Sequence, residues 1–166
     1  LSEFEANLAL ATDGTERIVG SLKTVSQQQT ETVSAEQSHI LDISGDLSPL
    51  FEARFRPFFG TQSSLRAKLR KVGDGRIHLD DLALETAALR ASGRAVIAPT
   101  NLPESFALSI AMGPTDGETL LLPASLELSL GSASLRARYD ASQSDTWTLD
   151  GVITRFSHPD IFAERI

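Results

Sequence analysis

The stretch "SFALSIAMG", residues 105–113, decides the fold because its side chains alternate strictly between two kinds. Phe106, Leu108, Ile110 and Met112 take every second position, and serine or alanine takes the positions between them. Side chains two residues apart point to the same face of an extended strand, so this pattern predicts a strand with one apolar face. Such strands are typical of antiparallel sheets that keep one face in water.

The same alternation recurs along most of the chain and predicts about nine or ten strands. The segments that follow it are "SLRAKLRK" (64–71), "RIHLDDLAL" (76–84), "LRASGRAVI" (89–97), "SLELSL" (125–130), "SLRARYDA" (134–141) and "WTLDGVI" (147–153). Asp-Gly pairs at 13–14, 74–75 and 116–117 are strong signals for hairpin turns, because glycine accepts positive φ there. Glycine also recurs inside strands, which predicts bends that would curve a sheet.

One segment, "SPLFEARFRPFFG" (48–60), breaks the alternation and predicts a short helix over about 48–59. Ser48 is a suitable helix cap and Pro49 a suitable first helical residue, whereas Pro57 and Gly60 limit the length. We interpret this helix as a structural plug packed on the apolar face, with a movable lid as the alternative. Its apolar residues are Leu50, Phe51, Phe55, Phe58 and Phe59. A second short helix is expected at 159–165.

Composition narrows the function. The 166 residues carry a formal net charge of −7, which argues against nucleic acid as a partner because phosphate binding needs a basic surface. The chain has no cysteine, so it has neither disulfides nor thiol chemistry. Its first residue is Leu1, and we expect a fragment of a longer protein. No long amphipathic helix is available to cover the sheet, so the pattern alone favours a closed β-sandwich or barrel over an open trough.

Three segments make the chain similar to the TamB family of translocation and assembly proteins, which belong with the AsmA-like proteins. They are "GDLSPLFEARFRPFFG" (45–60), "DGETLLLP" (116–123) and "LRARYDASQSDTWTLDG" (135–151). The resemblance implies an all-β, curled, groove-forming sheet in place of the closed sandwich, with 1–166 as one segment of a longer β-repetitive protein. It also implies a periplasmic location, with the parent protein anchored in the inner membrane.

The same resemblance implies a non-enzymatic role in outer-membrane biogenesis. The groove would shield phospholipid acyl chains or outer-membrane protein strands, and the parent protein would work with an outer-membrane barrel partner, TamA. We expect the groove to be lined by apolar residues of the strands in the second half of the chain. They are Phe106, Leu108, Ile110, Met112, Leu126, Leu128, Leu130, Leu135, Tyr139, Trp147 and Leu149.

Other functions have weaker support in the sequence. His78, Asp80 and Asp81 suggest a metal site, since His78 and Asp80 are expected on one face of a strand. No third ligand is evident on that face, and the solvated side of a half-buried strand explains these residues better. No catalytic motif is found, and no cofactor or metal is expected. The alternating basic residues of "RAKLRK" and "RARYD" fit a solvated face, or contact with anionic lipid headgroups. The rival hypothesis is a β-sandwich module for adhesion or carbohydrate binding, although the polar loops have few aromatic residues.

Overall fold

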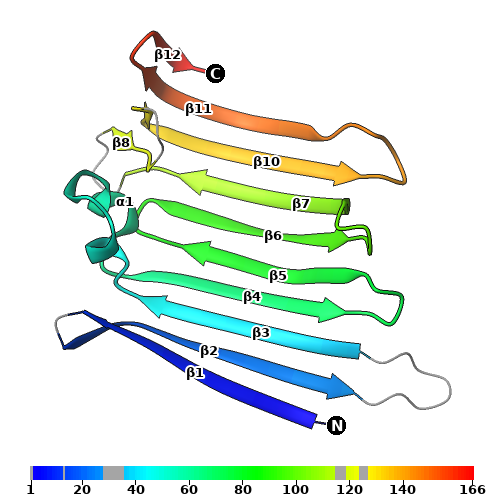
Figure 1. Ribbon diagram of the computed structural model, residues 1–166. Coiled ribbons are helices and arrows are strands. Elements are labelled where there is room, and N and C mark those ends of the chain that lie inside the picture. The colour runs from blue at the N-terminus through cyan, green and yellow to red at the C-terminus, as the bar shows by residue number, and fades with distance from the viewer. Residues whose placement is uncertain (1, 13, 28–35, 115–118, 124–126) are drawn as a thin grey trace.

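The structure is a computed structural model that describes residues 2–12, 14–27, 36–114, 119–123 and 127–166. These residues form one twelve-stranded sheet in which every pair of strands is antiparallel (Figure 1). The strands are β1 (Ser2–Thr12), β2 (Thr15–Gln27), β3 (Glu36–Gly45), β4 (Ser63–Lys71), β5 (Ile77–Glu85), β6 (Leu89–Ile97), β7 (Pro103–Met112), β8 (Leu120–Leu121), β9 (Ser129–Leu130), β10 (Ser132–Asp140), β11 (Thr148–His158) and β12 (Ile161–Arg165).

The sheet is a meander, because from β1 to β7 each strand pairs with the next one along the chain. After β7 the order continues with β10 and β11, while β8 and β9 form a short ladder that joins β11 through Ser129 and Ser157. β1 lies at one edge, and the sheet does not close on itself. The curled, groove-forming all-β prediction is therefore confirmed, and the closed-sandwich alternative is wrong. The adhesion or carbohydrate-binding hypothesis loses the closed scaffold on which it depends.

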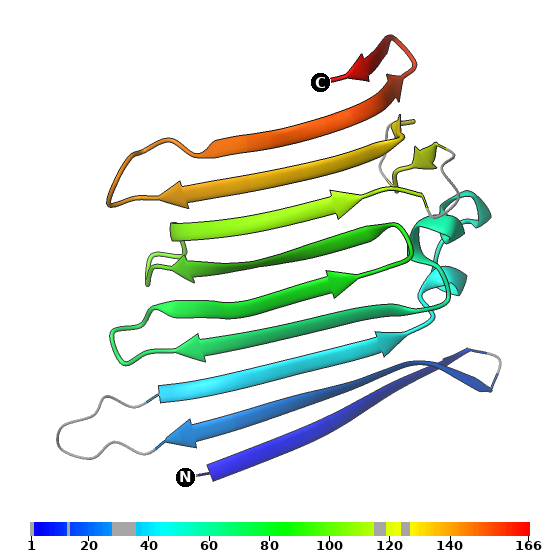
Figure 2. The same cartoon turned by 180° about the vertical axis from the view of Figure 1, so that it is seen from behind.

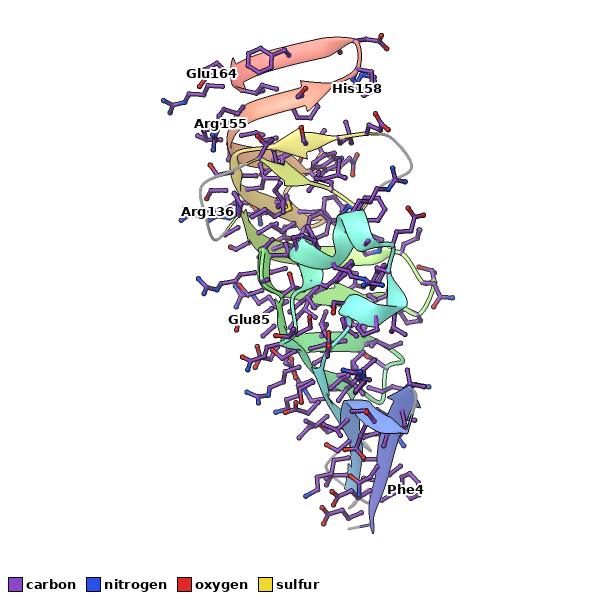
Figure 3. The ribbon with its side chains drawn as sticks, turned by 90° about the vertical axis from the view of Figure 1, so that its left-hand side faces the viewer. Phe4, Glu85, Arg136, Arg155, His158 and Glu164 are labelled. Atoms are coloured by element: carbon purple, nitrogen blue, oxygen red, sulfur yellow. The ribbon has the colours of Figure 1, made fainter. Side chains whose placement is uncertain are left out.

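Register places most of the apolar residues of the long strands on one face, although Val19, Ile40 and Val96 lie in rows of the other face. Leu22 of β2 lies opposite Leu41 of β3, and Leu65 of β4 lies opposite Leu84 of β5. In Figure 3, the labelled Glu85 and Arg136 point to one side of the sheet, whereas Phe4 and the helical segment lie on the other. We call the side that carries Phe4 the apolar face and the side that carries Arg136 the polar face.

The segment 48–59 is helical only in pieces, so the prediction of one continuous helix is wrong. It contains the 3-10 turns η1 (Ser48–Leu50) and η2 (Ala53–Phe55) and the single α-helical turn α1 (Arg56–Phe59). The backbone is extended at Phe51, whose ring turns back to stack on Phe59 with centroids 3.7 Å apart. Pro57 has no N–H for a continuous helix, which adds to the break.

Ser48 does not cap this segment as predicted. It lies inside the first 3-10 turn, whose N-cap position is Leu47 and has no side-chain cap, and its backbone N–H and hydroxyl donate hydrogen bonds to Oδ1 of Asp46. All three helical pieces lie at one end of the strands, away from the β4–β5 hairpin (Figure 2). The segment therefore covers an end of the sheet and not its middle.

Two further elements differ from the predictions. The helix expected at 159–165 is instead β12, which pairs with β11 from Thr154 to His158 and so continues the sheet. The strand expected at 125–130 is reduced to β9, since only Ser129–Leu130 pairs there, and residues 124–126 lie outside the described ranges. Leu120 and Leu130 are buried in one cluster with Phe58.

Candidate functional site: an open apolar face

The middle of the apolar face alternates large and small side chains across neighbouring strands. Leu108 of β7 lies between Gly93 of β6 and Ala137 of β10. In the next row, Ile110 lies between the small Ala91 and the large Leu135, and Leu135 in turn lies opposite Gly151. This alternation gives the face a shallow relief of ridges and hollows in place of a flat surface. Aliphatic side chains of this kind offer apolar area without fixing the orientation of a ligand, unlike the polar groups of most small-molecule pockets.

Two mid-strand glycines let aliphatic side chains lie directly on the backbone. A Cβ at Gly93 would lie 2.6 Å from Cδ2 of Leu108, and a Cβ at Gly151 would lie 2.8 Å from Cδ2 of Leu135. Real Cβ atoms essentially never approach other atoms so closely. The glycines thus allow the leucines to bend over the neighbouring strand, in agreement with the predicted role of close approach.

Most of this face remains in contact with water. No large side chain in the chain is less than 2% exposed, and Phe4, Leu8 and Leu149 are 61%, 63% and 54% exposed. The accessible surface is 11,035 Å². A compact monomer of this mass would expose about 8,000 Å², so the sheet lacks the second layer that normally covers an apolar face.

The plug covers one end of the face and leaves the rest open. Phe58 is only 6% exposed and packs with Ala88, Leu120, Leu130 and Ala133 in the largest buried cluster. Phe59, Leu89, Met112, Leu122, Leu135 and Ile153 surround this cluster. The backbone holds the plug in place, because Ala87 and Ala88 donate hydrogen bonds to the carbonyl oxygens of Phe59 and Phe58. Leu50 is 52% exposed and contributes little to the covering.

The structure gives the predicted lining residues different places. Phe106, Leu108, Ile110, Met112, Leu135, Tyr139 and Leu149 share the apolar face through the register of β7, β10 and β11. Trp147 comes immediately before β11 and is 61% exposed. Leu130 is buried beneath the plug, so it does not line an open groove. Leu128 lies beside the β8–β9 ladder, and Leu126 lies outside the described ranges.

The apolar face also extends across the first half of the chain, which the predicted lining omits. Leu41 and Ile43 of β3 lie opposite Ala67 and Leu65 of β4. Leu82 and Leu84 of β5 continue the same rows toward β6. The alternation of 64–71 and 76–84 already indicated one apolar face in these strands. The sequence did not show that these strands lie beside those of the second half in one sheet. The open face therefore runs from β1 to β11.

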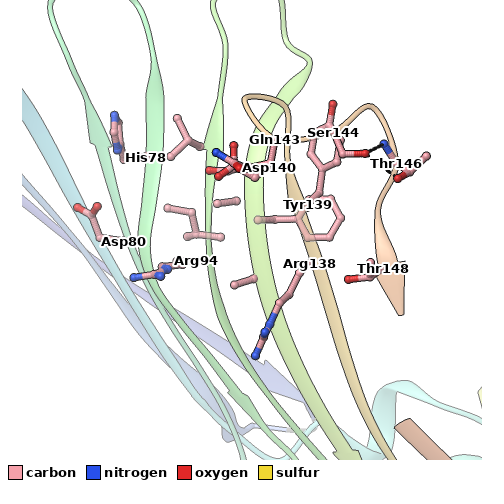
Figure 4. Close-up of a pocket in the computed structure, with 16 residues that line it drawn as sticks. His78, Asp80, Arg94, Arg138, Tyr139, Asp140, Gln143, Ser144, Thr146 and Thr148 are labelled. Atoms are coloured by element: carbon pink, nitrogen blue, oxygen red, sulfur yellow. Dashed lines mark hydrogen bonds between the residues drawn. The ribbon is translucent and has the colours of Figure 1, made fainter. Parts of the chain in front are cut away.

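A polar hollow of about 880 Å³ lies on the opposite face, between β5, β6, β7, β10 and the loop after β10 (Figure 4). Arg94 and Arg138 flank Ala107 in register on its two sides. Asp80, the extra residue of a β-bulge in β5, accepts hydrogen bonds of 2.8 and 3.0 Å from Arg70. His78 and Asp80 both line the hollow, but the Asp80 carboxylate is already paired.

The aspartates around this face act as structural partners. The guanidinium of Arg70 lowers the pKa of Asp80 below its ordinary value, chiefly through the hydrogen bond. The Ser142 hydroxyl does the same to the pKa of Asp140, and the Ser48 hydroxyl to that of Asp46. Within the described ranges there is no group of three or more His, Cys, Asp or Glu side chains that could hold a metal ion. Among the described residues that line the hollow, no hydrogen bond joins a hydroxyl to a histidine ring.

These lowered pKa values make acid stability predictable. A carboxyl whose folded-state pKa lies below its unfolded value stabilises the fold above the unfolded value, and this contribution is lost as the pH falls through the folded value. We therefore expect the free energy of unfolding to fall on acidification below about pH 4. Urea titrations between pH 3 and 7 measure it. The variant Asp80→Asn should show a shallower fall, and an equally steep fall would contradict a role for the Arg70–Asp80 pair.

Among the described residues, no helix is long and apolar enough to cross a membrane. Comparisons with protein-family models, with curated proteins and with solved structures find no match to this chain. The site must therefore be interpreted from its own geometry.

Proposed function

We propose that this chain is a non-enzymatic, periplasmic segment of a TamB-like protein whose apolar face is a groove for cargo. The cargo is phospholipid acyl chains or outer-membrane protein strands in transit between the inner and outer membranes. The observation that carries the proposal is the open apolar face from β1 to β11, over which the described residues form no covering layer beyond the plug at one end. The parent protein would be anchored in the inner membrane and would work with a TamA-like outer-membrane barrel.

Acyl chains suit the geometry of the face. Each methylene that leaves water for an apolar surface gains about 0.8 kcal/mol, so a long chain needs no specific contact to be held. The relief around Leu108 and Ile110 consists of aliphatic ridges and small hollows, which contact a flexible chain without fixing its position. A cargo held in this way can slide, as transport between membranes requires.

Outer-membrane protein strands are the second candidate cargo, and a different feature supports them. β1 extends over Ser2–Thr12 and pairs with β2 alone, so its outer edge has unpaired backbone groups along eleven residues. Such an edge is a template for the addition of another strand. The two cargoes therefore engage different parts of the sheet, the face for an acyl chain and the edge for a strand.

A charge placed in the middle of the apolar face tests the acyl-chain proposal. We expect Leu108→Glu to reduce bound acyl lipid about tenfold, because a bound chain would strip water from the new carboxylate. The measurement is mass spectrometry of lipid that copurifies with the protein without detergent. Ser109→Glu is the matched control, since the neighbouring residue of β7 lies on the polar face.

Both variants should keep the circular dichroism spectrum of the unmutated chain. Retention of lipid by Leu108→Glu at the level of Ser109→Glu would show that the face does not hold the acyl chain. If the unmutated chain copurifies without lipid and also fails to bind added fatty acid, the proposed function as a whole is contradicted.

A further inference from the structure

Polar side chains gather on the apolar face at one corner, far from the plug. In β2 and β3, Thr24 lies opposite His39, and Ser26 lies opposite Gln37. Gln37 in turn lies opposite Lys71, the last residue of β4. Because β3 runs from this corner toward the plug, the two features occupy opposite ends of the same strands. We call Thr24, His39, Gln37 and Lys71 the polar corner.

The corner carries the cation of this face. Among the described residues of β1 to β7, register places only one lysine or arginine side chain on the apolar side, that of Lys71. The neighbouring basic residues of β4, Arg66, Lys68 and Arg70, point to the polar face. Within the described part of the chain, Lys71 forms no ion pair, whereas Arg66 and Arg70 pair with Asp42 and Asp80.

His39 is oriented by its neighbour. Its Nδ1 lies 2.9 Å from Oγ1 of Thr24, and no other hydrogen bond of the His39 ring occurs among the described residues. With the Thr24 hydroxyl as donor to Nδ1, the proton of the neutral imidazole is on Nε2, which can then donate to an acceptor above the sheet. Diagonal neighbours on adjacent strands lie about 7–8 Å apart, so His39 and Lys71 can contact one small anion together.

Apolar residues lead away from the corner in the two directions that a tail could take. Leu69 and Leu79 continue the row of His39 across β4 and β5, and Leu22 and Leu41 form the next row along β2 and β3. Strands are about 4.8 Å apart, so the path from β3 to β7 spans about 19 Å. This length is comparable to that of a long fatty acyl chain.

We propose that the groove takes an anionic amphiphile, whose carboxylate or phosphate head binds His39 and Lys71 and whose acyl tail lies on the apolar rows toward β7. This proposal rests on the proposed function and adds the chemistry of the ligand and its direction. Charge complementarity carries it, because the sheet places an oriented imidazole and a lysine with no ion pair among the described residues on a face that is mainly apolar. An outer-membrane protein strand, which has no terminal anion within the sheet, gives no reason for such a corner.

A fluorescent fatty acid and its neutral ester test the proposal. We expect the full chain to bind cis-parinaric acid more tightly than cis-parinaric methyl ester at pH 8, with both probes below their micelle concentrations. Lys71→Met should weaken binding of the acid about fivefold, the effect of losing one exposed ion pair, and leave binding of the ester unchanged. Lys68→Met is the matched control, since it removes a cation from the polar face of the same strand.

His39→Leu, which also enlarges the apolar face, should weaken the acid and strengthen the ester. Competition with lysophosphatidic acid and oleate then separates the two sources of an anionic head, because the better competitor identifies phosphate or carboxylate. Two results would overturn the polar corner but leave the groove intact. One is equal affinity of the unmutated chain for the acid and the ester, and the other is an equal loss of affinity for the acid in Lys71→Met and Lys68→Met. If neither probe binds to the folded, unmutated chain, the groove and the polar corner are overturned together.

Discussion

Phe58→Ala is expected to lower the free energy of unfolding by about 3–5 kcal/mol, the cost of deleting a buried phenylalanine ring. Phe58 is 6% exposed and contacts the other members of the largest buried cluster. In an ordinary domain, many surrounding core side chains can shift to fill part of such a cavity. Here the cluster beneath the plug is the thickest packing in the described structure, so few neighbours can collapse into the space.

Urea unfolding followed by circular dichroism measures the effect, and Leu50→Ala in the same segment is the control. Leu50 is 52% exposed, and truncation there should change stability by no more than about 0.5 kcal/mol. Comparable losses in both variants would show that the segment contributes through its backbone and not through the Phe58 ring. Loss of the ring should also raise binding of an apolar dye, because the end of the face near Met112 would be uncovered.

Gly45→Ala is the second large expected effect, a loss of about 3 kcal/mol or more. Gly45 ends β3 with φ +151°, where a side chain is strained. A Cβ there would lie 2.0 Å from the carbonyl oxygen of Arg17 and 2.7 Å from Cα of Ile18. Both atoms are backbone, so relief requires β2 and β3 to separate. The same Arg17 oxygen accepts the hydrogen bond of Asp46 N, which directs the chain from β3 into the plug.

Gly14→Ala separates strain from collision. Gly14 has φ +73°, but a Cβ there would have nothing within 4 Å, so its replacement should cost only about 1–2 kcal/mol. Thermal unfolding of the two variants gives the difference. Hydrogen exchange should locate the effect of Gly45→Ala in β2 and β3. If both replacements cost the same, the close approach of Gly45 to Arg17 is not what requires glycine.

Local signals in the sequence predicted the strands because alternation is a local property. Phe106 to Met112 reports its face without reference to any partner, and register then unites it with Ala95 and Tyr139. The turn at 74–75 was also correct: Gly75 has φ +87°, and its N–H donates to the carbonyl oxygen of Val72. Alternating side chains and a turn residue are enough to predict a hairpin between two strands that are neighbours in the chain.

The features that the sequence did not predict depend on distant contacts. Whether an apolar face folds on itself is decided by packing between strands remote in the chain, so periodicity alone favoured the wrong, closed architecture. Phe51 leaves the helix because its ring stacks on Phe59, and Leu130 leaves the groove because Phe58 buries it. The polar corner could not be predicted from the sequence for the same reason, since His39 and Lys71 become neighbours on one face only when β3 pairs with β4.

The neighbour-only order of β1 to β7 has a consequence for how such a protein can vary. Each strand contacts the strands next to it, so the architecture is nearly one-dimensional, as in repeat proteins. A hairpin can be added or removed without redesign of a central core, because no such core spans the sheet. The apolar path would lengthen by about 9.6 Å with each added hairpin. The distance that a sheet of this kind bridges is therefore set by the number of its hairpins, and natural selection can adjust it one hairpin at a time.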